Sequence, residues 1–101
     1  MAIDVNSGRS AQEKNIESTA FRTNMEAAEE VARQLRLRNM GGLIVVDFID
    51  MENSKNRLAV EQKMEEELSP DKSKTSVSSI SKFGLMELSR QRISALSLIH
   101  I

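Results

Sequence analysis

The fold is decided by one stretch of sequence, Leu43-Ile44-Val45-Val46-Asp47-Phe48-Ile49. Most of its side chains are β-branched, and the run is too short for an amphipathic helix, so it predicts a strand. Its apolar residues are continuous rather than alternating, which is typical of a strand covered on both faces, as in a parallel sheet. We therefore expect residues 43–49 to form the central strand of an α/β fold.

Helical periodicity flanks this strand on both sides. Over residues 16–38 and again over residues 54–68, apolar side chains recur at steps of three and four, which places them on one helix face. Glycines end the first segment and Pro70 ends the second. The two apolar stripes consist of Phe21, Met25, Ala28, Ala32 and Leu35, and of Val60, Met64 and Leu68.

Three weaker elements complete the expected order. Residues 2–5 form a short apolar run that stops at a turn, and residues 75–80 are serine-rich with two β-branched apolar residues, so both are interpreted as strands. Residues 84–93 are interpreted as a short final helix because Leu85, Leu88 and Arg92 are spaced along it at steps of three and four. The order β-α-β-α-β-α predicts an α/β fold with a small, mainly parallel sheet covered by helices.

The composition excludes several classes of chemistry. The chain has no cysteine, and its only histidine, His100, is the second-last residue. These counts rule out disulfides, a thiolate zinc site, a cysteine nucleophile, a Ser-His-Asp triad and a multi-histidine metal site. Three Phe without Trp or Tyr also supply little for base stacking. Any catalysis must therefore be carried by carboxylates, supported by hydroxyl, amide and basic side chains.

Length, charge and hydropathy limit which partners and which cellular compartment are expected. The 101 residues suffice for one domain, and 14 basic against 15 acidic side chains favour neither nucleic acid nor a membrane as a partner. No stretch approaches the roughly 18 apolar residues of a membrane helix. Residues 1–4 lack the basic start of a secretory signal. We expect an intracellular, reducing setting, and hence a cytoplasmic protein without a membrane span.

Two carboxylates stand at matching places in the expected strands. Asp4 and Asp47 each lie in the carboxyl-terminal part of an apolar strand, where ligands bind in open α/β sheets. If the strands are neighbours, the two anions repel unless a cation lies between them, and Mg²⁺ prefers such hard oxygen ligands. Asn6 would share the face of Asp4 if the strand continued. The alternative is that each Asp only caps the turn that follows, and spacing alone leaves both interpretations open.

Four blocks of the sequence resemble the bacterial ribonuclease E/G family. Ala2-Ile3-Asp4-Val5-Asn6-Ser7-Gly8-Arg9 looks like its metal-site strand, and the run from Arg33 to Met51 looks like its most recognisable motif. Residues 23–29 and 81–92 are similar to two further blocks. The blocks are long, correctly ordered and correctly separated. The resemblance covers residues 2–93.

This resemblance implies a Mg²⁺-dependent endoribonuclease that prefers single-stranded RNA. Such enzymes mature ribosomal and transfer RNA and degrade messages, leaving 5′-phosphate and 3′-hydroxyl ends. The family's magnesium-binding aspartates match Asp4 and Asp47, and the asparagine that helps to hold the metal and its waters matches Asn6. A basic residue near the scissile strand matches Lys74. Residues 1–93 then correspond to the family's catalytic subdomain, which is deoxyribonuclease-I-like.

The sequence also departs from the family's pattern. The RNA-binding, 5′-end-sensing and ribonuclease-H-like regions are missing, so we expect a fragment of a larger enzyme that is weak or inactive alone. The cysteine pair that many members use for a shared zinc is missing too, so we expect no zinc site here, and any homo-oligomer would belong to the full-length enzyme. Residues 94–101 are expected to be a truncated or non-native tail. A non-catalytic α/β module for RNA binding or assembly stays the alternative.

Overall fold

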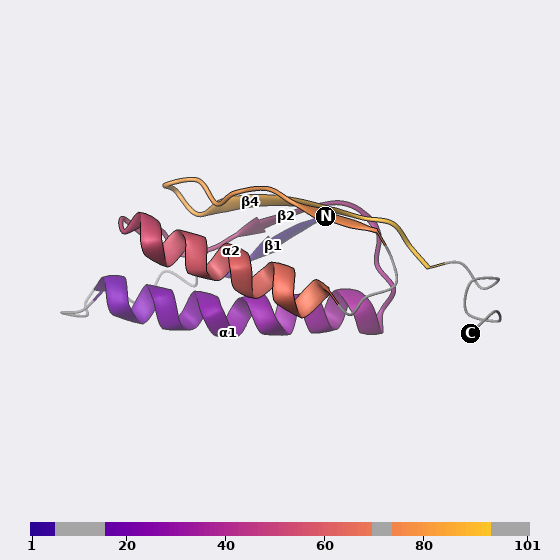
Figure 1. Cartoon of the computed structure of the whole chain (residues 1–101), viewed down its shortest axis with the longest axis horizontal. Coiled ribbons are helices and arrows are strands. Elements are labelled where there is room, and N and C mark those ends of the chain that lie inside the picture. The colour runs from indigo at the N-terminus through magenta and orange to yellow at the C-terminus, as the bar shows by residue number, and fades with distance from the viewer. Residues whose placement is uncertain (6–15, 70–73, 94–101) are drawn as a thin grey trace.

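The computed structural model describes residues 1–5, 16–69 and 74–93, and these form one sheet with two helices (Figure 1). Residues 94–101, expected to be a truncated or non-native tail, lie outside the described residues. In chain order the elements are β1 (Ala2–Asp4), α1 (Ile16–Leu37), β2 (Gly42–Asp47), α2 (Ser54–Leu68), β3 (Thr75–Val77) and β4 (Leu85–Arg90).

The α/β class is confirmed, but the sheet is mixed. The strand order is β1-β2-β4-β3. Only β1 and β2 run parallel, whereas β4 is antiparallel to both of its neighbours, β2 and β3. The expectation of a mainly parallel sheet is therefore corrected to one parallel pair and two antiparallel pairs. The reason is that residues 85–90 form a strand, which follows β3 through a turn and pairs between β3 and β2.

The final helix expected over residues 84–93 is wrong, because residues 85–90 form β4. The buried side chains there are Met86, Leu88 and Arg90, and they alternate with exposed ones, which is the period of a strand. The three-residue spacing of Leu85 and Leu88 indicated a helix only because Met86 was left out of the pattern. β2 offers a row of backbone groups along this edge, and pairing from Gly42↔Arg90 to Asp47↔Leu85 satisfies them.

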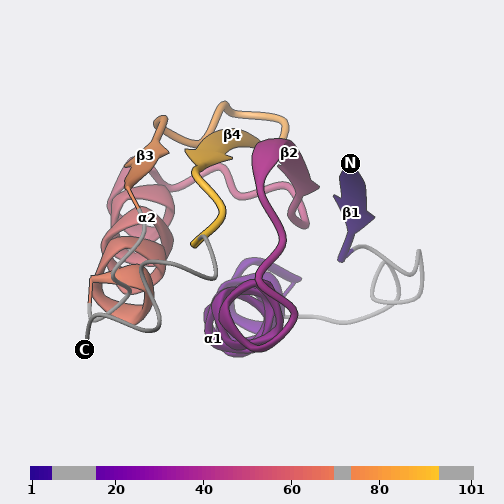
Figure 2. The same ribbon diagram turned by 90° about the vertical axis from the view of Figure 1, so that its right-hand side faces the viewer.

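Both helices pack on the same face of the sheet (Figure 2). The core is formed by Ile44 and Val46 of β2 and Met86 and Leu88 of β4 against the helix stripes. The stripe of α2 is confirmed, since Val60, Met64 and Leu68 are buried; in α1 Ala28, Ala32 and Leu35 are buried, and Phe21 and Met25 pack against the core. Among the described residues nothing covers the other face, where Leu43 and Leu85 are 61% and 48% exposed. The expectation that β2 is covered on both faces is therefore wrong for this part of the chain.

One buried amide fixes the chain where it leaves β2. Asn24 of α1 is completely buried. Its Nδ2 donates to the Ile49 carbonyl at 2.9 Å, and its Oδ1 accepts from the Ile49 N–H at 3.0 Å. A buried side chain that satisfies both backbone groups of one residue replaces a missing strand partner. Asn24 therefore ties the segment after Asp47 to the middle of α1.

A second polar contact fixes the turn between α1 and β2. Asn39 takes the left-handed conformation that ends α1, with φ of 49°. Its Oδ1 accepts from the Ile93 N–H at 2.9 Å, and its Nδ2 donates to the Ile93 carbonyl at 2.8 Å. The buried Arg90 guanidinium donates to the Met40 carbonyl at 2.6 Å. The asparagine thus has the role expected for the glycines, while Gly42, with φ of 94°, opens β2.

The helices are also linked to each other and to the loop after β2. Lys63 of α2 lies 3.4 Å from a Glu29 carboxylate oxygen of α1 and 3.2 Å from one of Glu67. Hydrogen bonds to Glu67 and Glu29 raise the pKa of Lys63, so its ammonium stays charged over a wider pH range. At the other end of α1, Glu17 accepts from the Glu52 N–H at 2.9 Å and from Asn56 Nδ2 at 2.7 Å.

Burial alone raises the pKa of the Glu17 carboxyl. Hydrogen bonds from the Asn56 side chain and the Glu52 N–H outweigh this effect. A backbone hydrogen bond from Asn53 and the positive charge of Arg57 act in the same direction, so the pKa lies below its ordinary value of 4.5. The ionised carboxylate is therefore the form that the folded chain prefers.

Replacing Asn24 by Ala should lower the free energy of unfolding by about 1–3 kcal/mol, because both backbone groups of Ile49 lose their partner. Urea denaturation of the 101-residue chain measures this value. The control is Arg22→Ala, an exposed position in the same helix, which should change it by less than about 0.5 kcal/mol. Equal effects of the two substitutions would contradict the role assigned to Asn24.

Replacing Glu17 by Gln should destabilise the chain near neutral pH and much less in acid. Because the pKa is lower in the folded state than in the unfolded state, the carboxylate stabilises the fold above about pH 4.5, and the effect fades as the pH falls through the folded-state pKa. The measurement is urea denaturation of both chains near neutral pH and at about pH 3. A difference in unfolding free energy that does not shrink in acid would show that the charge is not responsible.

Candidate functional site

Asp4 and Asp47 lie side by side at the ends of β1 and β2. The two residues are register partners in the parallel pair, and the Val5 N–H donates to the Asp47 carbonyl at 2.9 Å. Both side chains are exposed. Ile3 and Val46, one position earlier in each strand, pack toward the helices, so alternation directs both Asp side chains to the uncovered face of the sheet. The expectation that the strands are neighbours is confirmed, and the structure brings the two carboxylates together.

This pair is a small, open set of oxygen donors. Neighbouring strands are about 4.8 Å apart, so two register partners on one face can share a single cation. Within residues 1–5, 16–69 and 74–93, no three His, Cys, Asp or Glu side chains gather closely enough to hold a metal ion. Asn6, the third expected site residue, lies outside the described residues. Two carboxylates nevertheless fit Mg²⁺, which usually binds one or two and keeps water or phosphate oxygens as its other ligands.

The backbone after Asp47 is held on both sides. On one side Asn24 binds Ile49, as described above. On the other side the Phe48 N–H donates to the Gly84 carbonyl at 2.8 Å, which extends the β2–β4 pairing one residue past Asp47. Gly84 has φ of 92°, and a Cβ there would lie 2.2 Å from the Phe48 carbonyl oxygen. Only glycine fits this approach, so Gly84 helps to position Asp47.

Lys74, the expected substrate-binding residue, lies at the other end of the sheet. It is exposed, immediately precedes β3, and its carbonyl accepts from the Gln91 N–H at 2.9 Å. Leu85 is the register partner of Asp47, and Gln91 follows Leu85 by six positions along β4 and its continuation, which corresponds to roughly 20 Å. The structure therefore separates Lys74 from the Asp4–Asp47 pair by a few nucleotide lengths.

Lys74 is one of the residues that line a polar hollow. Its volume is about 220 Å³, and besides Lys74 it is lined by Thr75, Ser76, Ser89, Arg90 and Gln91. Ser76 and Ser89 are register partners and are exposed on the uncovered face. Hydroxyl groups beside an ammonium can donate hydrogen bonds to an anion. Sequence analysis identified Lys74 but not these partners, because they come together only through the β3–β4 pairing.

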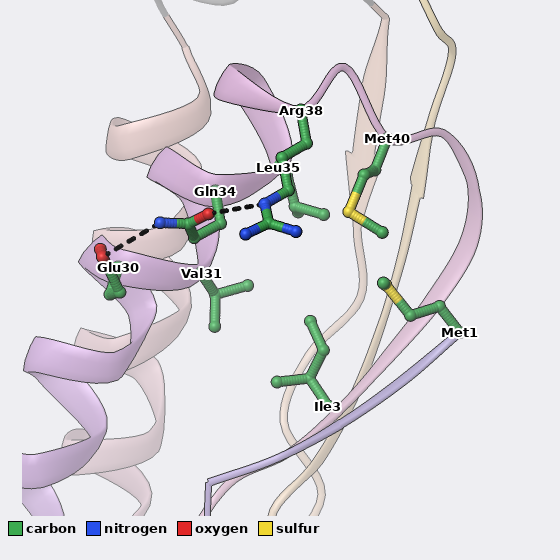
Figure 3. Close-up of a pocket in the computed structure, with 8 residues that line it drawn as sticks. All are labelled: Met1, Ile3, Glu30, Val31, Gln34, Leu35, Arg38 and Met40. Carbon is green, nitrogen blue, oxygen red and sulfur yellow. Dashed lines mark hydrogen bonds between the residues drawn. The ribbon is translucent and has the colours of Figure 1, made fainter.

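An apolar hollow lies on the opposite side of β1 and was not expected from the sequence (Figure 3). It measures about 350 Å³ between β1 and the end of α1. Arg38 Nε donates to Gln34 Oε1 at 3.0 Å along its edge. Its lining residues are Met1, Ile3, Glu30, Val31, Gln34, Leu35, Arg38 and Met40. Because Ile3 faces the helices and Asp4 faces away from them, this hollow is not part of the carboxylate site.

Comparisons with known proteins match this chain to one protein family. A family model described as the ribonuclease E/G family matches residues 1–93, which include every described residue. Within those residues, no helix is long and apolar enough to span a bilayer.

Individual relatives agree with the family model. Over 93 residues the chain is 55% identical to ribonuclease E of Escherichia coli, covering 92% of this chain and 9% of the relative. Ribonuclease E of Haemophilus influenzae is 53% identical over 93 residues, which are 92% of this chain and 10% of the relative. Ribonuclease G of Escherichia coli is 48% identical over 90 residues, which are 89% of this chain and 18% of the relative. The chain thus spans about a tenth to a fifth of the length of these relatives.

Replacing Gly84 by Ala should destabilise the chain more than the same change at Gly42. Both glycines have positive φ, so each substitution strains the backbone by roughly 1–2 kcal/mol. Only at Gly84 would the new Cβ also collide with the Phe48 backbone, whereas nothing lies within 4 Å at Gly42. Urea denaturation of both variants tests this order. A Gly42 variant that is equally destabilised would show that the close approach at Phe48 is not required.

Proposed function

The chain belongs to the ribonuclease E/G family, and from this membership we propose that it carries the metal-binding carboxylates of a Mg²⁺-dependent endoribonuclease. The observation that supports this most directly is the register pairing of Asp4 with Asp47 on an uncovered sheet face. Two exposed anions held side by side by the backbone repel each other, and a shared divalent cation offsets that repulsion. The residues 1–93 then act as the family's deoxyribonuclease-I-like catalytic subdomain.

In this proposal Asp4 and Asp47 hold Mg²⁺ and Asn6 contributes its amide oxygen or orients a water. When bound, Mg²⁺ would act as a Lewis acid that polarises a phosphodiester and lowers the pKa of a water molecule. Asp4 and Asp47 fix that charge at the surface of the sheet, so an extended RNA strand reaches it without displacing a helix. Water adds to phosphorus and the bond to the 3′-oxygen breaks, which leaves a 5′-phosphate and a 3′-hydroxyl.

Lys74 is proposed to bind a backbone phosphate of the same RNA strand, away from the scissile bond. Lys74 lines one hollow together with the exposed residues Ser76 and Ser89. The separation of roughly 20 Å from the carboxylate pair corresponds to a few nucleotides of extended single strand. A single-stranded RNA fits a shallow, open sheet face. From the family we propose that the substrates are ribosomal, transfer and messenger RNA. The cytoplasmic location stays a prediction.

A second candidate is a non-catalytic α/β module for RNA binding or assembly. It is favoured by one observation, namely that the chain spans about a tenth of ribonuclease E, so most of the relatives' length lies elsewhere. The carboxylate pair would then serve the catalysis of a longer polypeptide only. The two candidates differ in what the 101-residue chain does alone.

Replacing Asp47 by Asn in a full-length family member that carries this segment should lower Mg²⁺-dependent cleavage by roughly 100-fold or more, because one of two anionic ligands is lost. The substrate is 5′-monophosphorylated single-stranded RNA, incubated with Mg²⁺ or with EDTA. The matched control is Asp50→Asn, an exposed carboxylate three residues further along the chain, which should leave cleavage unchanged. Cleavage that survives Asp47→Asn would refute the metal-binding role.

The same assay on the 101-residue chain separates the two candidate functions. We expect weak cleavage or none, since a single open face offers few contacts to hold RNA. Residual cleavage that requires Mg²⁺ and disappears in the Asp47→Asn chain would favour the catalytic candidate for this segment by itself. RNA binding without any cleavage would favour the module.

A further inference from the structure

Phe83 is an exposed aromatic residue in the turn at the end of the sheet that carries the carboxylate pair. The chain has three Phe and neither Trp nor Tyr. Phe48 is completely buried and Phe21 packs against the core, whereas Phe83 is 69% exposed. An aromatic ring left this exposed forgoes most of the free energy that its burial would contribute. Core packing therefore does not account for Phe83.

The turn that carries Phe83 is held by backbone hydrogen bonds. The Gly84 N–H donates to the Ser81 carbonyl at 2.9 Å, and the Ser81 N–H donates to the Leu85 carbonyl at 2.9 Å. The Ser81 hydroxyl oxygen also accepts from the Leu85 N–H at 3.1 Å. The Gly84 carbonyl in turn binds the Phe48 N–H. These bonds fix the backbone of Phe83 relative to the end of β2.

This turn lies at the same end of the sheet as the two carboxylates. Asp4 pairs with Asp47, and Asp47 pairs with Leu85. Phe83 precedes Leu85 by two residues and lies in the turn before β4, so the chain separates the two Cα atoms by at most about 7 Å. Lys82, next to Phe83, is exposed and adds a positive charge to this turn.

We propose that Phe83 stacks on an unpaired base of an RNA strand whose phosphate lies at the Asp4–Asp47 pair. This inference rests on the proposed function. An exposed ring on a turn at the same end of the sheet as a phosphate site offers an apolar face of the right size for a base. Stacking needs no particular base, but it does need one that is free of its own stack, so Phe83 selects single-stranded RNA. The Lys82 ammonium is available to the neighbouring phosphate.

The lack of Trp and Tyr in the chain makes this contact directly measurable. In the Phe83→Trp chain the new side chain is the only Trp or Tyr. Adding a single-stranded oligoribonucleotide with Mg²⁺ should quench its fluorescence, whereas a ribose-phosphate chain of the same length without bases should not. The matched control is Leu58→Trp, a 51% exposed position in α2, in the helix layer, which RNA should not quench. Equal responses to both oligomers, or none, would overturn the inference.

The affinity for RNA provides a second test. Phe83→Ala should weaken binding of single-stranded RNA by roughly 5- to 100-fold, and Phe83→Leu should not restore it, because Leu lacks a π-face. Both variants replace an exposed side chain and should unfold at the wild-type urea concentration. Full affinity in the Phe83→Leu chain would show that the contact is merely apolar and would overturn stacking.

Failure of the stacking role and failure of the proposed function give different results. If Asp47→Asn abolishes cleavage while the Phe83→Trp chain is not quenched, the proposed function stands and the stacking role fails. If Asp47→Asn leaves cleavage intact, the proposed function fails, whatever the Phe83→Trp chain shows. A Trp emission that moves to shorter wavelength with rising protein concentration and without RNA would show that a second protein surface covers Phe83, which also overturns the inference.

Discussion

The backbone of β2 is hydrogen-bonded along both of its edges, and the rest of the structure depends on this constraint. On one edge β1 runs parallel to it and on the other β4 runs antiparallel. Because register in a sheet sets which side chains share a face, these two pairings decide that Asp4 is beside Asp47. A slip of one residue would turn Asp47 toward the helices and expose Val46. The position of the carboxylate pair is thus a property of the sheet as a whole.

The two faces of the sheet have different roles. One face buries apolar side chains against α1 and α2 and supplies the free energy that keeps the chain folded. The other face, as far as the described residues show, carries carboxylates, hydroxyl groups and some exposed apolar side chains. Helices that pack on one side only leave the second side free for an extended polymer. The arrangement suits a substrate that lies across strands and does not enter a deep pocket.

Two asparagine side chains, one buried and one half-buried, link these two roles. Asn24 and Asn39 each bind both backbone groups of a distant residue, Ile49 and Ile93 respectively. Each therefore fixes a segment that leaves the sheet, where no neighbouring strand is available. Complete hydrogen bonding offsets the cost of burying Asn24, and its two bonds to Ile49 hold the backbone that follows Asp47. Positioning of the candidate site therefore depends on residues that never contact a substrate.

Local pattern alone determined much of this protein. The apolar run ending in Asp47 identified the central strand, helical spacing identified α1 and α2, and the motif around Asp4 indicated the family. These features are visible because a strand or a helix repeats its chemistry over neighbouring residues. The same local pattern made residues 84–93 a helix, since Leu85 and Leu88 fit a helical spacing when considered without their partners. Pairing with β3, and with β2 some forty residues away, makes β4 a strand.

Tertiary structure likewise decided everything that depends on distance between segments. It made the sheet mixed, placed both helices of the described residues on one face, brought Asp4 to Asp47 and separated Lys74 from both. It also placed an exposed Phe83 at the carboxylate end, although composition alone argued against base stacking. The reason is physical: periodicity records which way a side chain points within one element, whereas proximity across a sheet is set by hydrogen bonds between elements whose register no local pattern specifies.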